Sequence, residues 1–210
     1  PRERMDADRL EREIDAPVEV FGETTNTTDT VRTRGREGAP HGTFAVAEAL
    51  TSAVGRSGNE WSAPPGGVWS STLLRPSFGP EHVGRLTFAG GLAVAEAVAA
   101  FGVDARLKWP NDVVVVRDDT EYKLAGVLTE AVVDDTVVAG KPVDEALDGP
   151  GDLQFVVVGI GINADLDPGE LSTDRAATTM RAAVGDVDPT DVAVALHEHL
   201  LARAADAETA

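Results

Sequence analysis

The sequence predicts an α+β fold in which helices pack on a mixed, mostly antiparallel β-sheet. Short apolar runs rich in valine recur along the 210 residues, and several are separated only by turn-sized segments, as in β-hairpins. Helical segments interrupt these strands at irregular intervals, whereas a doubly wound parallel sheet alternates strand and helix regularly. Since the length suits one substantial core, we expect 1–210 to form a single domain.

In the first half of the chain, turn-forming residues separate short apolar runs from two polar helical segments. Pro17 ends the first helix, because proline lacks the backbone donor that a helix interior needs. Thr24, Thr25 and Asn26 can cap the second helix, because side-chain oxygens accept hydrogen bonds from its first backbone amides. The predicted elements are a helix over 1–16, a strand over 18–21, a helix that reaches Arg36, and strands over 43–49 and 68–74.

The second half begins with the clearest helix of the sequence, which Pro80 opens and Gly102 closes around a broad apolar stripe. Trp109-Pro110 then favours extended backbone, so Lys108 is expected at the end of a strand. A loop rich in Gly, Pro and Asp is expected inside a later hairpin. The predicted elements are strands over 113–116, 122–133 and 154–158, the loop over 139–151, and helices over 173–184 and 189–204.

Acidic residues outnumber basic ones by 36 to 18, and the resulting net charge of −18 is spread along the sequence. Such a surface suits a very salty cytosol, where the Debye length falls to about 3 Å at molar salt. The balance argues against nucleic-acid binding by a basic face. The sequence has no cysteine, which excludes thiolate chemistry, and no apolar run approaches the ~18 residues of a membrane span. We therefore expect a cytoplasmic protein with no membrane partner.

Two lysines and a carboxylate lie close together on one predicted hairpin. Lys108 and Asp112 precede its first strand, and Lys123 lies inside the apolar strand that returns. Because an unpaired ammonium is costly to bury, Lys123 needs an anionic partner, which a bound carboxylate or phosphate would supply. Gly126 marks a close backbone approach on the same strand. Arg56, the single basic residue in a loop of small residues, can grip a phosphate through two hydrogen bonds.

The stretch from Gly159 to Ala164 follows a strand and superficially matches a dinucleotide-binding fingerprint. That fingerprint needs a helix to begin at the turn, whereas Pro168 and its acidic neighbours continue a loop, so a dehydrogenase is not expected. The glycines instead allow backbone to pass close to a ligand, with the Asn163 amide at a base edge or a phosphate; the alternative is a bulge with a capping Asn. His197 and His199 point to different sides of a helix and cannot share a metal, and all four histidines are expected at the surface.

Three motifs, in this order and spacing, resemble the catalytic domain of biotin protein ligases. They are Lys108-Trp109-Pro110-Asn111-Asp112, the run 123–130, and Gly159-Ile160-Gly161-Ile162-Asn163. The resemblance extends upstream to Thr24-Thr25-Asn26 and covers roughly Val18 to the final helix. It implies the fold shared by biotin ligases and class II aminoacyl-tRNA synthetases. Neither a DNA-binding domain nor a small C-terminal SH3-like domain is evident in 1–210, and β-edge contacts common in the family lead us to expect a homodimer.

The resemblance implies an enzyme that uses ATP to convert biotin to biotinyl-5′-AMP and then transfers biotin to a lysine of a carboxylase's biotin carboxyl carrier domain. Cations must neutralise the biotin carboxylate and the triphosphate while the α-phosphate is attacked. The resemblance implies that Lys123 binds the carboxylate and the adenylate, and that Arg56 binds the phosphate of the intermediate. It places Lys108, Asn111 and Asp112 along the phosphates, with Mg²⁺ at Asp112. The residues implied around biotin are Thr24, Thr25, Asn26, Leu50, Val54, Gly55 and Gly126, and those implied at adenine are Trp61 and Asn163.

Two departures from the family pattern concern the contacts to biotin and phosphate. Family members usually have Gly-Arg-Gly-x-x-Gly-Arg before the tryptophan, whereas 53–59 retains only Arg56, and Leu50 replaces the usual glutamine. We predict weaker retention of the adenylate or reduced activity, because losing one charged contact costs about 1.5 to 3 kcal/mol. The alternatives are a lipoate ligase or acyltransferase of the same fold, whose apolar tunnel Leu50 would suit, and a degenerate, non-catalytic biotin-binding protein.

Overall fold

The computed structural model describes residues 4–53, 55, 61–141, 143, 145–146, 151–173 and 175–209. An eight-stranded sheet organises them, with strand order β1-β2-β3-β8-β6-β5-β4 and with β7 paired to β6. β1 and β2 are parallel, whereas the other neighbours are antiparallel. The predicted α+β class and its mostly antiparallel sheet are thus confirmed.

The strands are β1 (Val18–Thr24), β2 (Phe44–Leu50), β3 (Val68–Leu74), β4 (Arg106–Lys108), β5 (Asp112–Arg117), β6 (Thr120–Val133), β7 (Thr136–Ala139) and β8 (Leu153–Ile162). The α-helices are α1 (Ala7–Glu13), α2 (Thr27–Arg36), α3 (Gly84–Ala99), α4 (Met180–Val184) and α5 (Pro189–Ala207), and short 3₁₀ turns span Pro80–His82 and Pro168–Glu170.

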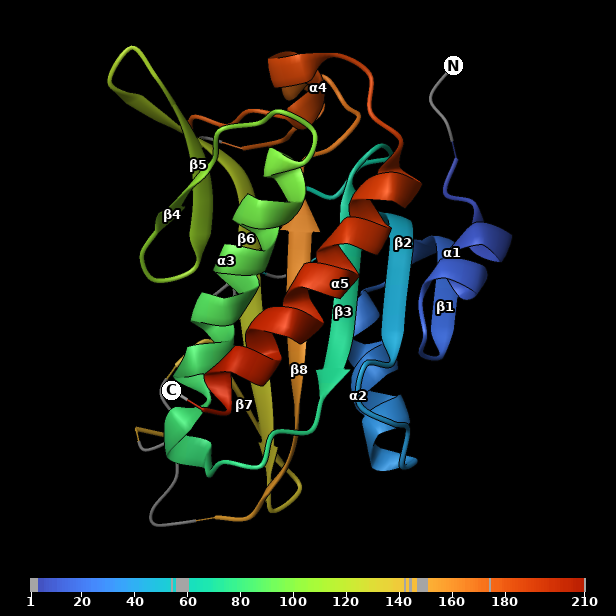
Figure 1. The fold of residues 1–210 in the computed structure, drawn as a ribbon, viewed down its shortest axis with the longest axis vertical. Coiled ribbons are helices and arrows are strands. Elements are labelled where there is room, and N and C mark those ends of the chain that lie inside the picture. The colour runs from blue at the N-terminus through green and yellow to red at the C-terminus, as the bar shows by residue number, and fades with distance from the viewer. Residues whose placement is uncertain are drawn as a thin grey trace.

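Helices cover both faces of the sheet. α3 and α5 lie side by side across one face, and α2 packs on the other face against β2, β3 and β8 (Figure 1). The side chains of β8 alternate accordingly: Val158 and Ile160 belong to the core beneath α3 and α5, whereas Phe155 and Val157 pack with Val31 of α2. A strand buried on both faces reads as a continuous apolar run, which is why 154–158 was recognisable as a strand.

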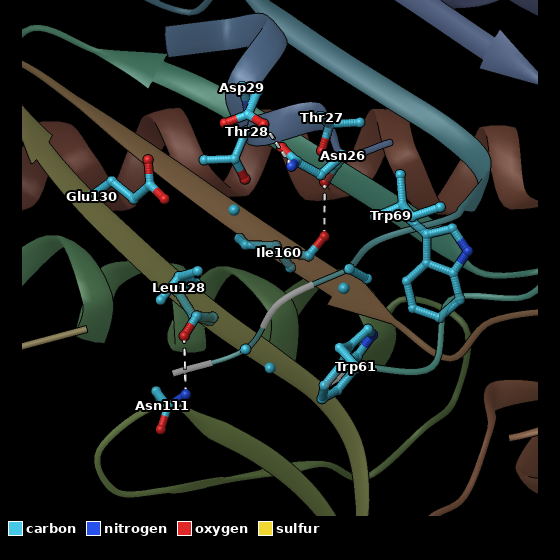
Figure 2. A pocket seen from close by; sticks show the side chains of 18 of the residues that line it. Asn26, Thr27, Thr28, Asp29, Trp61, Trp69, Asn111, Leu128, Glu130 and Ile160 are labelled. Carbon is cyan, nitrogen blue, oxygen red and sulfur yellow. Dashed lines mark hydrogen bonds between the residues drawn. The ribbon is translucent and has the colours of Figure 1, made fainter. Parts of the chain in front are cut away.

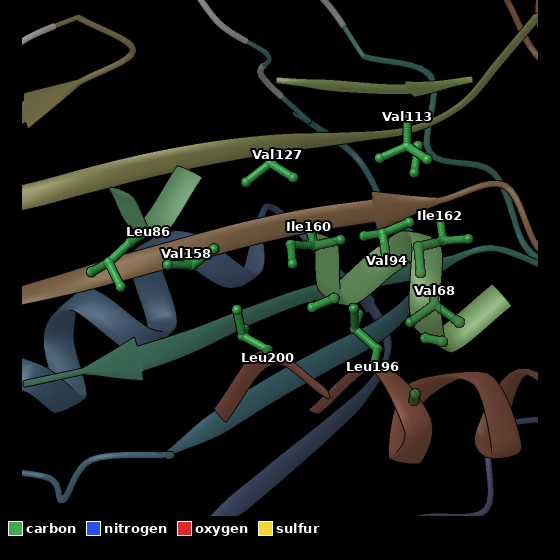
Figure 3. Packing of buried hydrophobic residues seen from close by; sticks show 14 of the residues in the cluster. Val68, Leu86, Val94, Val113, Val127, Val158, Ile160, Ile162, Leu196 and Leu200 are labelled. Atoms are coloured by element: carbon green, nitrogen blue, oxygen red, sulfur yellow. The ribbon is translucent and has the colours of Figure 1, made fainter. Parts of the chain in front are cut away.

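The larger core fills the space between the sheet and the α3–α5 layer. Figure 3 shows Leu86 and Val94 from α3 and Leu196 and Leu200 from α5 directed at the sheet, where Val158 meets them. Each of these side chains is at most 1% exposed. Full burial of one such side chain contributes roughly 1.5–3 kcal/mol, so this layer forms a firm support for the opposite face.

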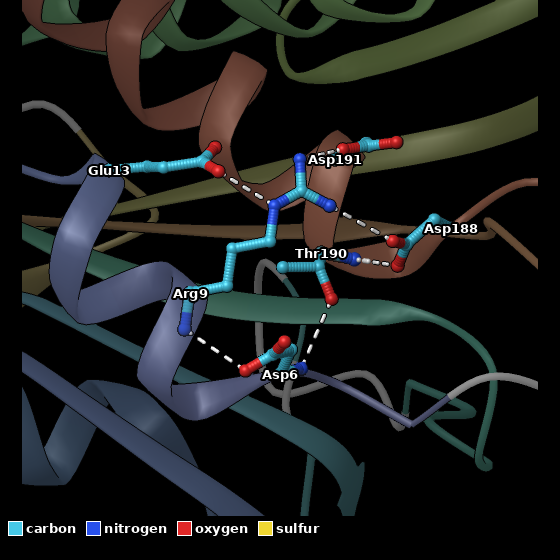
Figure 4. Close-up of polar contacts among 6 residues, drawn as sticks. All are labelled: Asp6, Arg9, Glu13, Asp188, Thr190 and Asp191. Carbon is cyan, nitrogen blue, oxygen red and sulfur yellow. Dashed lines mark hydrogen bonds and ion pairs between the residues drawn. The ribbon is translucent and has the colours of Figure 1, made fainter.

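Charged side chains attach α1 to the start of α5 (Figure 4). The Arg9 guanidinium contacts Asp188 at 3.2 Å and also contacts Asp191. The backbone amide of Asp6, which caps α1, donates to Thr190 Oγ1 at 3.1 Å. The first helix of the described chain is therefore held by polar contacts in addition to the burial of its apolar side.

Most predicted elements are confirmed, with differences at their ends. The helix expected over 1–16 covers Ala7–Glu13, and the strand expected over 18–21 continues to Thr24. β3 has the predicted bounds, and Lys108 ends β4 as expected. β7 was not predicted, because its short run of Thr136, Val137, Val138 and Ala139 lies next to the loop-like composition of 139–151.

Two predictions are wrong. The helix expected over 173–184 begins only at Met180, because 176–179 lies in extended conformation beside β6, with Ala177 bridged to Lys123. His197, expected at the surface, is buried: its Nε2 donates to the carbonyl oxygen of Gly42 at 2.8 Å and its ring meets the Phe44 ring edge-on. In the described part of the chain, no helix is both long and apolar enough to cross a membrane.

Candidate functional site

A β-bulge determines which face of the sheet Lys123 occupies. Val113 of β5 pairs with Ala125 of β6, but Val114 pairs with Lys123, so Leu124 is an extra residue. Leu124 and Ala125 both belong to the core beneath the helix layer. Strict alternation from Gly126 would instead point Lys123 into that core. The bulge places Lys123 on the opposite face, the same face as Gly126.

The ammonium of Lys123 has an anionic partner within the protein. Its Nζ lies 2.5 Å from Asp112 Oδ1, with the two side chains 17% and 19% exposed. The same Nζ lies 4.6 Å from the centre of the Trp61 ring, which adds a cation–π contact. Asp112 thus supplies the anionic partner that the sequence indicated for Lys123, and an anionic ligand would have to compete with this carboxylate.

A cavity of about 360 Å³ lies on this face of the sheet, beside the amino end of α2. In Figure 2, Asn26, Thr27 and Asp29 lie on one side of it, and Leu128 and Asn111 lie on the other. The lining residues are Asn26, Thr27, Thr28, Asp29, Arg32, Leu50, Ala53, Gly55, Trp61, Trp69, Ser70, Asn111, Lys123, Gly126, Val127, Leu128, Glu130, Gly159, Ile160 and Gly161.

The glycines of the 159–163 motif keep this cavity open. Both lie within β8, so the motif is strand and not the turn of a dinucleotide-binding fold. They occupy the same face as Val157, because residues two apart on a strand share a face. A Cβ added to Gly159 would lie 3.2 Å from Thr28 Oγ1, and one added to Gly161 would lie 3.1 Å from Trp61 Nε1. Side chains there would fill the space between β8, α2 and the indole.

Polar groups from the amino end of α2 form one wall of the cavity. Asn26 caps the helix, with its Oδ1 accepting from the backbone amide of Asp29 at 2.7 Å. The hydroxyls of Thr27 and Thr28 lie 2.9 Å and 3.1 Å from Ser71 Oγ, which anchors this end of α2 to β3. A ligand in the cavity would therefore meet hydroxyl and amide groups on one side and the aliphatic Leu128 on another.

An ion pair that the sequence reasoning missed closes one part of the cavity. Arg32 Nη1 lies 2.5 Å from Glu130 Oε2, and Arg32 also contacts Asp29 one helical turn earlier. Glu130 belongs to the motif over 123–130, whereas in the sequence Arg32 looks like an ordinary exposed residue of a charged helix. Only the packing of α2 on the sheet, which brings Arg32 to Glu130 of β6, identifies Arg32 as a cavity residue.

A smaller cavity of about 50 Å³ adjoins the first, and both are lined by Lys123 and Trp61. The Asn163 side chain donates to the carbonyl oxygen of Thr178 at 3.0 Å, which leaves its Oδ1 free. Asn163 Oδ1, Trp61 Nε1 and Thr178 Oγ1 are buried without a hydrogen-bond partner among the described residues. Buried polar atoms are nearly always paired in folded proteins, and Asn163 and Trp61 line the small cavity, so their unpaired atoms suit a bound ligand with a donor and an acceptor.

The predicted site residues are only partly brought together. Asn26, Leu50, Gly55, Trp61, Asn111, Lys123, Gly126 and Asn163 line one or both of these cavities. Asp112 is held against Lys123, whereas Lys108 is more than half exposed and pairs with Glu121 at 2.5 Å. Thr24 and Thr25 precede the cap of α2 and are not among the lining residues of the described cavities. Val54 and Arg56 lie outside the described residues.

Backbone contacts to β6 fix the position of Asn111. Its Nδ2 donates to the carbonyl oxygen of Val127 at 3.0 Å, and its own carbonyl accepts from the Val127 amide at 2.9 Å. Paired in this way to the middle of β6, Asn111 lies at the edge of the large cavity a few residues along from Lys123.

Comparisons with known proteins agree with this geometry. The model of the biotin/lipoate A/B protein ligase family matches residues 21–141. The bifunctional ligase/repressor BirA of Bacillus subtilis is 30% identical over 152 residues, which are 70% of this chain and 41% of that protein. The biotin–[acetyl-CoA-carboxylase] ligase of Paracoccus denitrificans is 35% identical over 142 residues, covering 64% and 51% of the two chains. The chain thus spans about half the length, or less, of these relatives.

Solved structures share the fold. The biotin protein ligase from Aquifex aeolicus, in a complex with biotin and ATP, superimposes with a TM-score of 0.67 and 26% sequence identity. The match covers 92% of this chain and 72% of that one. A protein of similar fold thus binds a small carboxylic acid and a nucleotide together.

Proposed function

Because the chain belongs to the biotin/lipoate A/B protein ligase family, we propose that it converts biotin and ATP to biotinyl-5′-AMP and transfers biotin to a carrier lysine. The observation that carries the proposal is the place of Lys123, which lines both the large cavity and the small one. An acid bound in the first cavity and a nucleotide that enters the second with part of its structure would meet at this ammonium. Activation of a carboxylate by ATP needs a cation at that junction.

In the proposed reaction, a biotin carboxylate oxygen attacks the α-phosphorus of ATP. A new P–O bond forms, the α–β anhydride bond breaks, and pyrophosphate leaves with the bonding electrons. The carrier amine then attacks the acyl carbon, so that an amide forms, AMP leaves with its oxygen, and the amine proton passes to solvent. Lys123 would exchange its contact with Asp112 for the incoming anions and so reduce the repulsion between carboxylate and phosphate.

Asp112 is the residue that we propose to hold Mg²⁺. No group of three or more His, Asp or Glu side chains in the described residues is arranged for a metal, so a metal here would need ligands from the substrate beside Asp112. That donor set fits an ion held jointly by one carboxylate and substrate phosphates. When bound, the ion would neutralise phosphate charge. Release of Asp112 from Lys123 on ligand binding would free its oxygens for this purpose.

The other predicted contacts remain proposals. Asn163 and Trp61 suit adenine, because their unpaired buried polar atoms border the small cavity. We keep Arg56 and Lys108 as predicted phosphate ligands, with Lys108 having to leave Glu121 to act. The homodimer, the cytoplasmic location and the single-domain organisation also stay predictions.

A lipoate or octanoate ligase is the second candidate, because Leu50 lines the large cavity where a polar residue would bind the biotin ureido ring. The polar wall from Asn26 to Asp29 favours biotin, whose ring system carries both donors and acceptors. An aliphatic chain would bring no donor or acceptor to this wall and would gain no hydrogen bond from it.

The test is biotin-dependent exchange of pyrophosphate into ATP, measured with Mg²⁺ at low and at molar salt, with lipoate and octanoate as parallel substrates. Exchange with biotin alone supports the proposed ligase. Exchange with lipoate or octanoate in place of biotin would assign the chain to the second candidate. If no acid supports exchange in either salt, adenylation is refuted and a non-catalytic binding protein becomes the better account.

A further inference from the structure

Arg175 lies at the mouth of the small cavity on a segment whose backbone is fixed to Lys123. The amide of Lys123 donates to the carbonyl of Ala176 at 2.9 Å, and the amide of Thr178 donates to the carbonyl of Lys123 at 2.9 Å. These two bonds form a parallel bridge between Lys123 and Ala177. These bonds hold the backbone near Arg175 close to Lys123, although the Arg175 side chain is 69% exposed.

The guanidinium of Arg175 is held only loosely within the protein. Its Nη1 lies 4.0 Å from Asp112 Oδ2, the longest ion-pair distance among the described residues. Lys123 occupies the other oxygen of the same carboxylate at 2.5 Å. Two cations thus face one carboxylate, and the pair with the longer distance can be given up at little cost in a solvent-exposed position.

Phosphate is the ligand chemistry that this arrangement suits. A guanidinium presents donors in a planar fork that matches two phosphate oxygens, and a loosely paired, exposed arginine is free to turn toward them. Arg175 lines the small cavity together with Lys123 and Asn163. A nucleotide seated there would place phosphate oxygens beside Lys123 and within reach of a side chain whose backbone is two residues from the bridge.

We propose that Arg175 is a substrate-binding residue that contacts the nucleotide phosphate, as a second cation beside Lys123. The inference rests on the proposed function. It also offers a reason why the loop over 53–59 can keep Arg56 as its single basic residue: a positive charge reaches the phosphates from another segment of the chain.

The test compares Arg175→Gln, Arg175→Lys and Arg106→Gln in biotin-dependent pyrophosphate exchange at low salt. Arg106 is a matched control, because its side chain is 68% exposed, it lies 3.8 Å from Asp104, and it lines none of the described cavities. Loss of a charged contact predicts a rise of about 10- to 100-fold in the KM for ATP for Arg175→Gln, with the KM for biotin unchanged. Arg175→Lys keeps the charge but not the planar fork and should recover only part of that loss, and Arg106→Gln should match the parent.

Release of biotinyl-5′-AMP from the parent and from Arg175→Gln gives a second measurement. We expect faster release from the variant, because the adenylate keeps the α-phosphate. Equal ATP KM values for Arg175→Gln and Arg106→Gln would overturn the inference. A parent protein that exchanges no pyrophosphate would instead refute the proposed function, so the two failures are distinguishable.

Discussion

Replacing Lys123 with alanine should separate the catalytic and the structural roles of its ion pair. The ammonium is the one cation of the described chain that lines both cavities and contacts a half-buried carboxylate at 2.5 Å. Removing one well-placed stabilising group from a transition state typically lowers kcat by roughly 10²–10³. We expect at least that loss in adenylation for Lys123→Ala, and no more than a small change for Lys141→Ala, which removes an equal charge elsewhere.

The same substitution leaves the Asp112 carboxylate without its close partner. A fully buried, unpaired charge costs about 3–5 kcal/mol, but Asp112 is 19% exposed and has Arg175 at 4.0 Å, so we expect a loss of about 1–2 kcal/mol in unfolding free energy. Adding Asp112→Ala to Lys123→Ala should recover much of that stability and none of the activity. Urea unfolding and single-turnover formation of biotinyl-5′-AMP measure the two quantities. Normal biotinyl-5′-AMP formation by Lys123→Ala would refute the assigned role.

Three further predictions follow from the cavity and the core. Leu50→Gln should lower the KM for biotin and leave the KM for ATP unchanged in the exchange assay, because an amide on the cavity wall can bind the ureido ring; an unchanged biotin KM would contradict this. Gly161→Ala should raise the KM for both substrates several-fold with little loss of stability in urea, because the new methyl group pushes on Trp61 Nε1 at 3.1 Å and Trp69 Cε3 at 3.2 Å; an unaffected enzyme would show that the indoles can move freely. Burial lowers the pKa of His197 from its usual 6.5. As the pH falls through that value, the unfolded chain therefore binds more protons than the folded protein, and the protein loses stability. The melting temperature of His197→Gln should depend less on pH than that of the parent between pH 5 and 7, and parallel curves of melting temperature against pH would contradict the assignment.

The sequence predicted the sheet better than the polar segment that completes the site. Apolar runs such as 68–74 carry their own signal, because a strand buried on both faces must be continuously hydrophobic. The segment over 176–179 has no such signal. Its extended conformation comes from hydrogen bonds of Ala176 and Thr178 to the backbone of Lys123, about 50 residues earlier in the chain, and local composition cannot reveal that contact.

The candidate site was predicted unevenly for similar reasons. Lys123, Asn111 and Gly126 were found because cation, amide and glycine occur together in motifs that need a physical explanation. Arg32 was missed because an arginine on a charged helix usually faces solvent, and only the position of α2 beside Glu130 makes it part of the cavity. The surface prediction for His197 was wrong because its ring hydrogen-bonds the Gly42 carbonyl, a tertiary contact that allows the polar ring to be buried.

The bulge at Leu124 also has a consequence for changes in chain length. Deleting one residue at a regular position of a strand moves every side chain on one side of the deletion to the opposite face of the sheet. At Leu124 the ladder already skips one residue, because Val113 pairs with Ala125 and Val114 pairs with Lys123. Removing Leu124 would close the ladder with both neighbours facing as before, at the expense of a fully buried core side chain. The bulge that places the Lys123 ammonium on the cavity face of the sheet is thus also the position where β6 can lose one residue while Lys123 stays on that face.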